Sequence, residues 1–303
     1  MTVSPASDNA PAPSQRAEGP WAMVSRRLFA KKATLVSMAL LVLALLCALF
    51  PTLLAPHDPY LQELVMRLKP PSFMERGIEG HFLGTDHLGR DILSRIIHGA
   101  RVTLLVSLMA LAVSLIIGVV AGLVGGFIGG RTDAIILRLI DMQLAFPVIL
   151  LVISIVAVLG PSLTNLIVIM GLSGWPRFAR LVRGAVLSVR GLEYVEAARA
   201  IGASRMRVMF NHILPNILSS IIVYSSFELA RMILLEATLS YLGLGVQPPE
   251  PTWGGMISEG QKYITQAWWV SLFPGLAIAG IILVFNMLGD ELRDALDPQL
   301  NHE

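Results

Sequence analysis

The sequence predicts an all-α, polytopic membrane protein with six transmembrane helices and both termini in the cytoplasm. Of the 303 residues, 54% are hydrophobic and only 15% are charged, whereas soluble domains carry about 25% charged residues. Apolar runs of the roughly 20 residues that a helix needs to cross a bilayer alternate with polar segments. The net charge of +2 is too small to indicate a nucleic-acid partner, and the single cysteine, Cys47, allows no disulfide framework.

The N-terminal third is predicted to contain a tail, one span and an outer segment. Residues 1–32 form a cytoplasmic tail whose Pro/Ala/Ser-rich start is typical of disorder. Residues 33–55 are an apolar run long enough to span the membrane, unlike a cleaved signal peptide. Positive charge before this run places the N-terminus in the cytoplasm. The basic residues are Arg26, Arg27, Lys31 and Lys32. Residues 56–101 then form a polar extracytoplasmic segment.

The second and third predicted spans each carry a packing signal. The second, residues 102–128, has small residues at every fourth position, which let a neighbouring helix approach closely in lipid. This small-residue stripe comprises Ser114, Gly118, Gly122, Gly126 and Gly130. The third, residues 134–159, opens with Arg138 and Asp141, which lie on one helical face and can neutralise each other. Pro147 is expected to kink this helix.

The fourth span decides the topology. Residues 162–175 fall short of the roughly 20 residues that a span needs, so the helix must continue through Arg180 with its arginines reaching the headgroups. With this span, the basic stretch 193–215 lies on the cytoplasmic side, as the positive-inside rule requires. Without it, that stretch would lie outside.

The fifth span, residues 216–244, is long for a bilayer and carries Glu228, Arg231 and Glu236. A lipid-exposed charge near the midplane costs roughly 2.5–3.5 kcal/mol. These side chains should therefore face other helices or an aqueous cavity. One interpretation is a structural network with Arg138 or with a partner subunit. The other is a polar lining of a translocation path, to which Glu228 or Glu236 would contribute.

An outer loop, residues 245–266, leads to the sixth span. Trp268 and Trp269 form an interfacial belt at its mouth, and the span ends near residue 288. The five spans after the outer segment thus form one unit, residues 102–290. Residues 291–303 are a cytoplasmic tail.

The longest polar interruption of the apolar second half, residues 193–215, is predicted to form a helix–glycine–helix hairpin. Residues 193–201 are good helix formers, and Gly202 ends that helix because glycine tolerates a positive φ. Ser204 is expected to cap a second helix, residues 205–212, which Pro215 ends. The basic and acidic residues of this stretch cannot face lipid, so it is predicted to be a docking element in the aqueous phase.

Within this hairpin, Glu196-Ala197-Ala198, Gly202 and the ending Leu214-Pro215 resemble the EAA loop of permease subunits in ATP-binding-cassette (ABC) importers. The resemblance implies an EAA-type cytoplasmic coupling loop that sits in a cleft of the ATPase subunit. His212 departs from the apolar residue usual at its position. The triplet is expected to form a small, close-approach face, because its alanines and the glycine turn let the helix seat deeply in a cleft. Glu196 can cap the helix or pair with a basic partner. The alternative is an ordinary cytoplasmic loop.

Further segments are similar to the dipeptide/oligopeptide/nickel permease group, and to the second of its two permease subunits. They are residues 83–91, 94–95, 99–101, 240–245, 247–249 and 289–298. The resemblance implies a second homologous permease subunit, two ABC ATPase subunits and an extracytoplasmic solute-binding protein. It also implies a multi-pass protein of a bacterial, Gram-negative inner membrane.

The residues indicate neither catalysis nor a cofactor in this chain. Gly125-x4-Gly130-Arg131-Thr132 differs from a phosphate-binding loop in its arginine and follows a transmembrane helix rather than a strand. A glycine-rich turn is the better interpretation, so ATP hydrolysis belongs to the partner subunits. Four histidines of the outer segment match no metal-ligand spacing and are interpreted as surface polar residues. They are His57, His81, His87 and His98.

These observations together predict the permease subunit of an ATP-driven importer for di- or oligopeptides. The same machinery for nickel chelates, glutathione or an opine-like solute remains an alternative, because a binding protein largely sets selectivity. A secondary transporter or channel is the rival from another class. It predicts inverted repeats or broken helices around ion sites, and the sequence has no obvious internal repeat.

Charge pairing among Asp86, Arg90 and Asp91 is expected to fix the outer segment.

Overall fold

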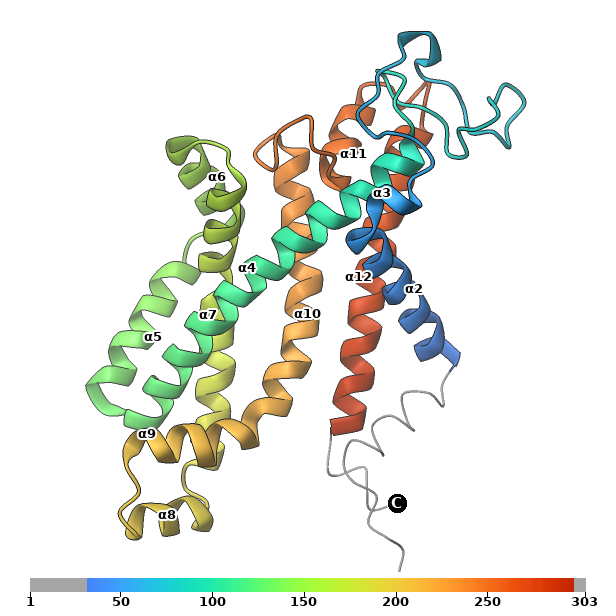
Figure 1. Cartoon of the computed structure of the whole chain (residues 1–303). Helices are drawn as coiled ribbons and strands as arrows, with labels where there is room; N and C mark the ends of the chain where they lie inside the picture. Colours follow the sequence, from blue (N-terminus) through green and yellow to red (C-terminus); the bar gives the residue numbers. More distant parts are fainter. Residues whose placement is uncertain (1–31, 297–303) are drawn as a thin grey trace, which may run out of the picture.

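The computed structural model describes residues 32–296, and every extended regular element in that range is a helix (Figure 1). The helices are α2 (Lys32–Leu49), α3 (Pro51–Leu54), η1 (Leu64–Met66), α4 (Ile92–Ile128), α5 (Gly130–Leu144), α6 (Val148–Leu159), α7 (Leu163–Val189), α8 (Glu193–Ala200), α9 (Arg205–Arg207), the π-helical η2 (Val208–Ile213), α10 (Leu214–Tyr241), α11 (Trp253–Gln261) and α12 (Trp269–Leu296). Most of the predicted N-terminal tail and the end of the C-terminal tail lie outside the described residues.

The small-residue stripe of α4 packs against α7, as predicted. A Cβ atom on Gly118 would stand 2.3 Å from Cβ of Phe178, and one on Gly122 would stand 2.7 Å from the carbonyl oxygen of Ala179. The hydroxyl of Ser114 donates to the carbonyl of Gly171. The two backbones therefore touch almost directly. Gly130 departs from the prediction because it lies beyond the end of α4, with no atom near its would-be Cβ.

Three of the described helices are long and apolar enough to cross a membrane: Ile92–Ile128, Arg205–Tyr241 and Trp269–Leu296. A fourth crossing is possible if α5 and α6 act as one bent span. The first predicted span is shorter than expected, since α2 ends at Leu49 and Pro51 begins the separate turn α3. The fourth continues through Arg180 to Val189 as one helix, as expected.

The third predicted span is broken rather than kinked. The axes of α5 and α6 differ by 83° across the gap that holds Pro147. The predicted pairing of Arg138 with Asp141 is also wrong, because Asp141 pairs with Arg180 of α7. A second ion pair, Asp133 with Arg183, joins the same two helices. Both contacts link residues far apart in the sequence, which helical spacing along one segment does not reveal.

Two boundaries around the outer segment differ from the prediction. Helix α4 begins at Ile92 rather than at residue 102, because Asp91 caps it by accepting a hydrogen bond from the backbone N–H of Ser94 at 2.8 Å. The predicted outer loop after α10 contains a helix, α11, capped by Thr252. The first turns of α4 were predicted to be a polar segment because they carry charged side chains. One of these, Arg95, pairs with Glu259 of α11.

An ion network holds the outer segment on α4 and α11. It confirms the predicted pairing of Asp86 with Arg90, whereas Asp91, the third residue of that prediction, caps α4 and contacts His81 instead. The buried carboxylate of Asp86 accepts hydrogen bonds from Arg90 Nε and Arg95 Nη1, both at 2.6 Å. The same two guanidinium groups reach Glu259 of α11 at 2.8 and 2.7 Å. Burial by itself would raise the pKa of Asp86, but the charges of Arg95 and Arg90 hold it below its usual value.

Arg95→Met is expected to destabilise this outer assembly, because Asp86 would stay buried with half of its cationic partners removed. Breaking a buried ion pair from one side costs about 3–5 kcal/mol. The thermal midpoint of the detergent-purified chain should fall by several degrees at pH 7. Arg101→Met is the matched control, since Arg101 is exposed. The depressed pKa of Asp86 means that its stabilisation is present above its unfolded pKa and disappears on acidification, so the two midpoints should converge at low pH. Equal midpoints at pH 7 would contradict this role of Arg95.

Candidate functional site

The stretch 193–215 folds into the predicted helix–glycine–helix hairpin at the end of the molecule opposite α11 (Figure 1). Gly202 has a φ of +82°. The N–H of Ala203 donates to the carbonyl of Ala198, and the N–H of Gly202 donates to that of Arg199. This pair of bonds is the Schellman motif, which ends a helix at a left-handed residue. No atom lies within 4 Å of a would-be Cβ on Gly202, so the backbone conformation alone demands glycine.

The second half of the hairpin departs from the prediction at Leu214 and Pro215. Ser204 caps α9 as expected, accepting from the N–H of Arg207. The helix does not end at Pro215, however, but runs on through η2 into α10. A π-helical turn absorbs the missing proline N–H, and the side chain of Asn216 donates to the carbonyl of His212 at 2.7 Å. The second half of the hairpin is therefore continuous with α10.

The Glu196-Ala197-Ala198 triplet has two faces. Ala198 is 5% exposed and packs with Val195 into a cluster that includes Val208, Met209 and Val186. Glu196 and Ala197 face outward. The triplet is thus not one small-residue face, because the helical period turns its third residue toward the chain's own core.

Two contacts fix α8 relative to the bundle. Its buried residues share a cluster with Leu123 of α4 and with α7, and the guanidinium of Arg199 lies 4.9 Å above the ring of Phe127. On the outward side, two large apolar residues are exposed: Ile201 by 86% and Met206 by 62%. The outward side of the hairpin thus combines polar residues with exposed large apolar side chains, which is typical of a surface that binds another protein.

The charged residues of α10 form one ion pair and one isolated carboxylate. Glu228 is 2% exposed, and both of its oxygens accept from Arg231 Nε at 2.9 Å. Arg177 of α7 stands 4.0 Å from the same carboxylate. Arg138, the partner considered from the sequence, is exposed on α5 and makes no pair in the described part of the chain. Arg177 was interpreted as a headgroup contact because helical spacing along α7 does not reveal that Glu228 of α10 lies beside it.

Glu236 lies apart from this pair, two turns further along α10. It is fully buried and accepts a hydrogen bond from the hydroxyl of Ser240 at 2.7 Å. Its second oxygen has no hydrogen-bond partner within the described residues. Both carboxylates are thus buried among the helices, whereas the side chains of Arg231 and Arg177 are 28% and 32% exposed.

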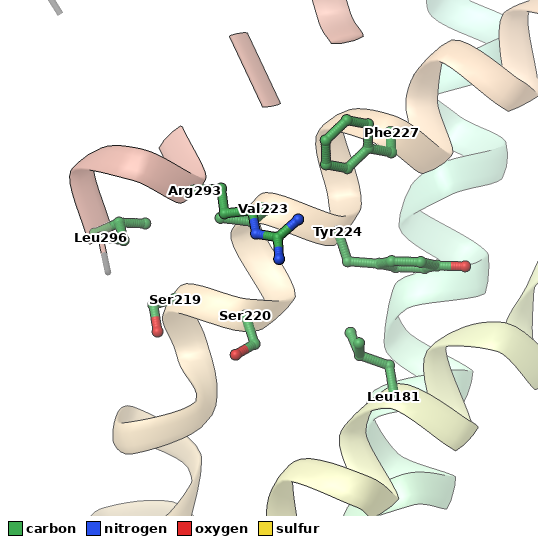
Figure 2. A pocket seen from close by; sticks show the side chains of 8 residues that line it. All are labelled: Leu181, Ser219, Ser220, Val223, Tyr224, Phe227, Arg293 and Leu296. Carbon is green, nitrogen blue, oxygen red and sulfur yellow. The ribbon is translucent and has the colours of Figure 1, made fainter. Parts of the chain in front are cut away.

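A cavity of about 450 Å³ opens between α7, α10 and α12 (Figure 2). Its α10 residues all precede Glu228 in the chain, in the part of the helix that leads from the hairpin. Arg293 of α12 and Tyr224 of α10 border it, with serine and aliphatic side chains around them. The lining comprises Leu181, Ser219, Ser220, Val223, Tyr224, Phe227, Arg293 and Leu296. Sequence reasoning missed these residues, because the seryl and aromatic positions carry no motif.

Comparison with known proteins shows which family this chain belongs to. Residues 114–302 match the family described as binding-protein-dependent transport system inner membrane component, and residues 19–71 match the N-terminal transmembrane domain of oligopeptide transport permease C. The chain belongs to the binding-protein-dependent transport permeases. The first match contains the hairpin, α10 and the cavity. The second contains α2, α3 and the beginning of the outer segment.

Curated relatives of this permease cover nearly its whole length. It is 47% identical over 269 residues to the dipeptide transport system permease protein DppC of Escherichia coli K12, covering 89% of this chain and 90% of the relative. It is 43% identical over 271 residues to the di/tripeptide transport system permease protein DppC of Pseudomonas aeruginosa, covering 89% of both. Its relatives are thus permease subunits of peptide transport systems.

Solved structures share the fold of this permease at low identity. One is an inward-facing conformation of the MetNI methionine ABC transporter, with a TM-score of 0.58 and 18% identity over 68% of this chain and 98% of that chain. Another is an amino acid ABC transporter, with a TM-score of 0.53 and 16% identity over 67% and 95%. The fold is therefore shared with ABC transporters.

Proposed function

We propose that this chain is the permease subunit of an ATP-driven importer of di- or oligopeptides. The observation that carries the proposal is the near full-length similarity to permeases of dipeptide and di/tripeptide systems, at 47% and 43% identity. The chain works without catalysis of its own, as the membrane half of a complex in a bacterial inner membrane. A second homologous permease, two ABC ATPase subunits and an extracytoplasmic binding protein complete the complex.

The hairpin 193–215 is the element that couples ATPase closure to the spans. Its Schellman turn, its contact with Phe127 and its continuity with α10 support this role. A push on α8 is passed to α4 and α7 through the shared apolar cluster. It reaches α10 through the Gly202 turn and the helix that runs without a break from Arg205 to Tyr241. Rigid-body motion of packed helices is a common form of such a switch. Glu196 and Ala197 offer the exposed contact for the ATPase subunit.

The six-span topology with both termini cytoplasmic belongs to the same proposal. In it, α2, the bent pair α5 and α6, and the arginine-bearing α7 cross the bilayer together with the three long apolar helices. Ion pairs with α5 cover two of the α7 arginines, Arg180 and Arg183. Pairing lowers the cost of charge near lipid. The resulting arrangement puts the hairpin in the cytoplasm and the ion network of Asp86 outside.

Glu228 is proposed to act mainly as the anchor of Arg231 and Arg177, on the edge of the translocation path. Glu228→Gln should therefore lower the stability of the purified chain by about 1–3 kcal/mol, because two cations lose their counter-charge. Glu236→Gln is the comparison variant, since it removes no ion pair, and its effect on stability should be smaller. Thermal unfolding and peptide uptake in proteoliposomes measure both. Unchanged stability with lost uptake in Glu228→Gln would instead make this carboxylate a direct part of the path.

The substrate is tested by uptake in cells that lack this gene and regain it. Labelled dipeptide, labelled tripeptide and ⁶³Ni²⁺ are compared in the deletion strain, the complemented strain and a strain complemented with Gly202→Pro. Uptake of peptide that returns only with the intact gene supports the proposal. Restoration of nickel uptake without peptide uptake would assign the chain to the nickel-chelate alternative.

A further inference from the structure

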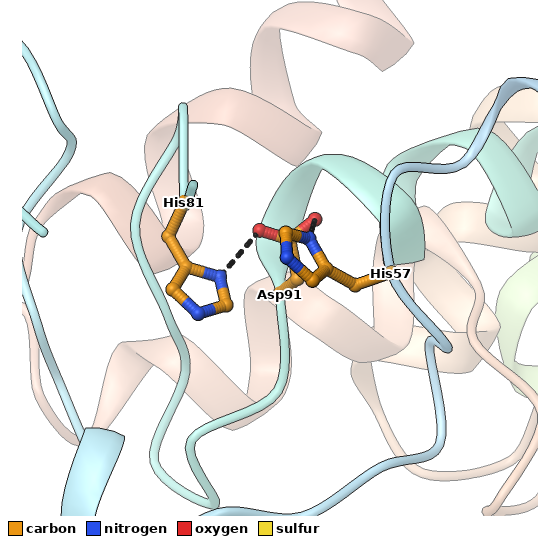
Figure 3. Close-up of side chains that lie close together, drawn as sticks. All are labelled: His57, His81 and Asp91. Carbon is orange, nitrogen blue, oxygen red and sulfur yellow. Dashed lines mark hydrogen bonds and ion pairs between the residues drawn. The ribbon is translucent and has the colours of Figure 1, made fainter. Parts of the chain in front are cut away.

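Two histidines and an aspartate from three separate segments meet at the start of α4 (Figure 3). Nδ1 of His81 lies 3.0 Å from Oδ1 of Asp91, and Nδ1 of His57 lies 3.8 Å from Oδ2 of the same carboxylate. With one ligand atom taken from each side chain, the three atoms all lie within 4.8 Å of one another. The two imidazole rings are stacked, with centroids 4.6 Å apart. Both rings thus turn the same kind of nitrogen toward one carboxylate.

One nitrogen of this cluster that could bind a metal makes no hydrogen bond within residues 32–296. The buried Nδ1 of His57 has no hydrogen-bond partner among the described residues, and 3.8 Å to Asp91 is too long for such a bond. Asp91 is itself held in place, because Oδ2 accepts from the N–H of Ser94 at 2.8 Å and from its hydroxyl at 2.7 Å. That hydroxyl also accepts from the backbone N–H of His57 at 3.0 Å. Supporting bonds of this kind orient metal ligands.

A second cluster of one histidine and two carboxylates differs from this one, because its carboxylates already have arginine partners. It consists of Asp86, His87 and Glu259, and both of its carboxylates are already paired with Arg90 and Arg95. A cation there would face two guanidinium groups. Asp91, in contrast, pairs with no arginine or lysine in the described part of the chain. Of the two groups, only the one around Asp91 has an unneutralised carboxylate.

We propose that His57, His81 and Asp91 form a binding site for a divalent transition cation of the Zn²⁺ class. Two imidazole nitrogens and one carboxylate oxygen are ligands that zinc takes, with water in the fourth position. Bonds of about 2.0–2.1 Å in tetrahedral geometry require ligand atoms roughly 3.3 Å apart. The distance from His81 Nδ1 to Oδ1 of Asp91, 3.0 Å, and that from His57 Nδ1 to Oδ2, 3.8 Å, lie on either side of that value. The half-exposed ring of His57 leaves the site open to water. Nitrogen donors disfavour Mg²⁺ and Ca²⁺.

The role of the bound cation would be structural. His57 follows α3, His81 lies in the outer segment and Asp91 caps α4. One ion would therefore fasten two parts of the outer segment, near residues 57 and 81, to the start of α4. The direction of this effect is set by linkage, since a ligand that binds only the folded outer segment stabilises it. The site stands on these three side chains alone and does not depend on the proposed substrate.

The test uses the full chain, purified in detergent with whatever subunits accompany it and stripped with EDTA. Titration with Co²⁺ should produce the visible bands of tetrahedral coordination, at about one ion per chain, and Zn²⁺ should abolish them by competition. His57→Ala and His81→Ala should each weaken binding at least tenfold, the scale on which even supporting residues act. His98→Ala is the matched control, because His98 lies on α4 and contacts the carbonyl of Ser94 instead.

Limited proteolysis of the outer segment supplies a second readout. Zn²⁺ should slow cleavage between residues 57 and 91 in the wild type and in His98→Ala, and should not slow it in His57→Gln/His81→Gln. The glutamines retain polar volume, so this variant separates loss of ligation from loss of folding. Binding of equal affinity in wild type and in both alanine variants would overturn the proposal, as would the absence of saturable binding by the wild type.

Discussion

Gly202→Pro is expected to abolish ATP-driven uptake while the chain still reaches the membrane. Proline fixes φ near −65°, whereas Gly202 has a φ of +82°. It also removes the N–H that donates to the carbonyl of Arg199 and disfavours the near-helical backbone of Ile201 before it. The Schellman turn therefore cannot form. Loss of uptake by more than tenfold in proteoliposomes, at equal membrane levels, is the expected measurement.

Two alanine variants isolate the backbone effect. Neither Gly191 nor Gly202 has an atom within 4 Å of a would-be Cβ, but only Gly202 has a positive φ. A left-handed alanine costs about 1–2 kcal/mol, so Gly202→Ala should reduce uptake and Gly191→Ala should not. Equal uptake in the two would show that the turn conformation does not matter.

Glu196→Arg acts on the same element through its exposed side. Glu196 faces outward from the first turn of α8, where negative charge complements the helix dipole. Reversal of this charge should impair ATPase docking without unfolding the hairpin, because the packing of Val195 and Ala198 is untouched. Survival of ATP-driven uptake in both Gly202→Pro and Glu196→Arg would refute the coupling role. External labelling of Arg205→Cys in intact cells would do so as well.

The features that the sequence predicted well are the ones that local chemistry decides. The positive φ of Gly202, the cap of Ser204 and the close packing along Gly118 and Gly122 follow from one residue or one helical period. The continuation of α7 through Arg180 follows from length. Each of these needs no knowledge of what lies across the bundle.

The features that were missed depend on partners distant in the sequence. From the sequence, Arg95 was assigned to a polar segment, because nothing near it in the chain shows that it pairs with Glu259 of α11. Arg177 was assigned to a headgroup contact for the same reason, although it lies beside Glu228 of α10. Ala198 has the same side chain as Ala197, and only the packing of α8 decides which of them is buried. The break at Pro147 was underestimated because a proline constrains its own turn but not the angle between the two halves.

Gly122→Ala should lower the stability of the helix bundle. Its new Cβ would stand 2.7 Å from the backbone carbonyl of Ala179 and 2.7 Å from Cβ of Val182. Neither is the end of a flexible side chain, so α4 and α7 would have to separate. Overpacking in a well-packed core costs about 1–3 kcal/mol, and occasionally more. The separation would also loosen the neighbouring contacts at Gly118 and Gly126.

Gly184→Ala is the matched control, and it should change stability in the opposite direction. Gly184 lies inside α7 with no atom within 4 Å of a would-be Cβ. Alanine in an open helical position is favoured over glycine by roughly 0.5–1 kcal/mol. The thermal midpoint in detergent should therefore fall for Gly122→Ala and hold or rise for Gly184→Ala. If both midpoints rise, helix propensity outweighs the α4–α7 contact, and the stripe is not what holds these two helices together. If the midpoint of Gly122→Ala alone falls, the small-residue contact is what holds α4 against α7, beside the apolar cluster that the hairpin shares with both helices.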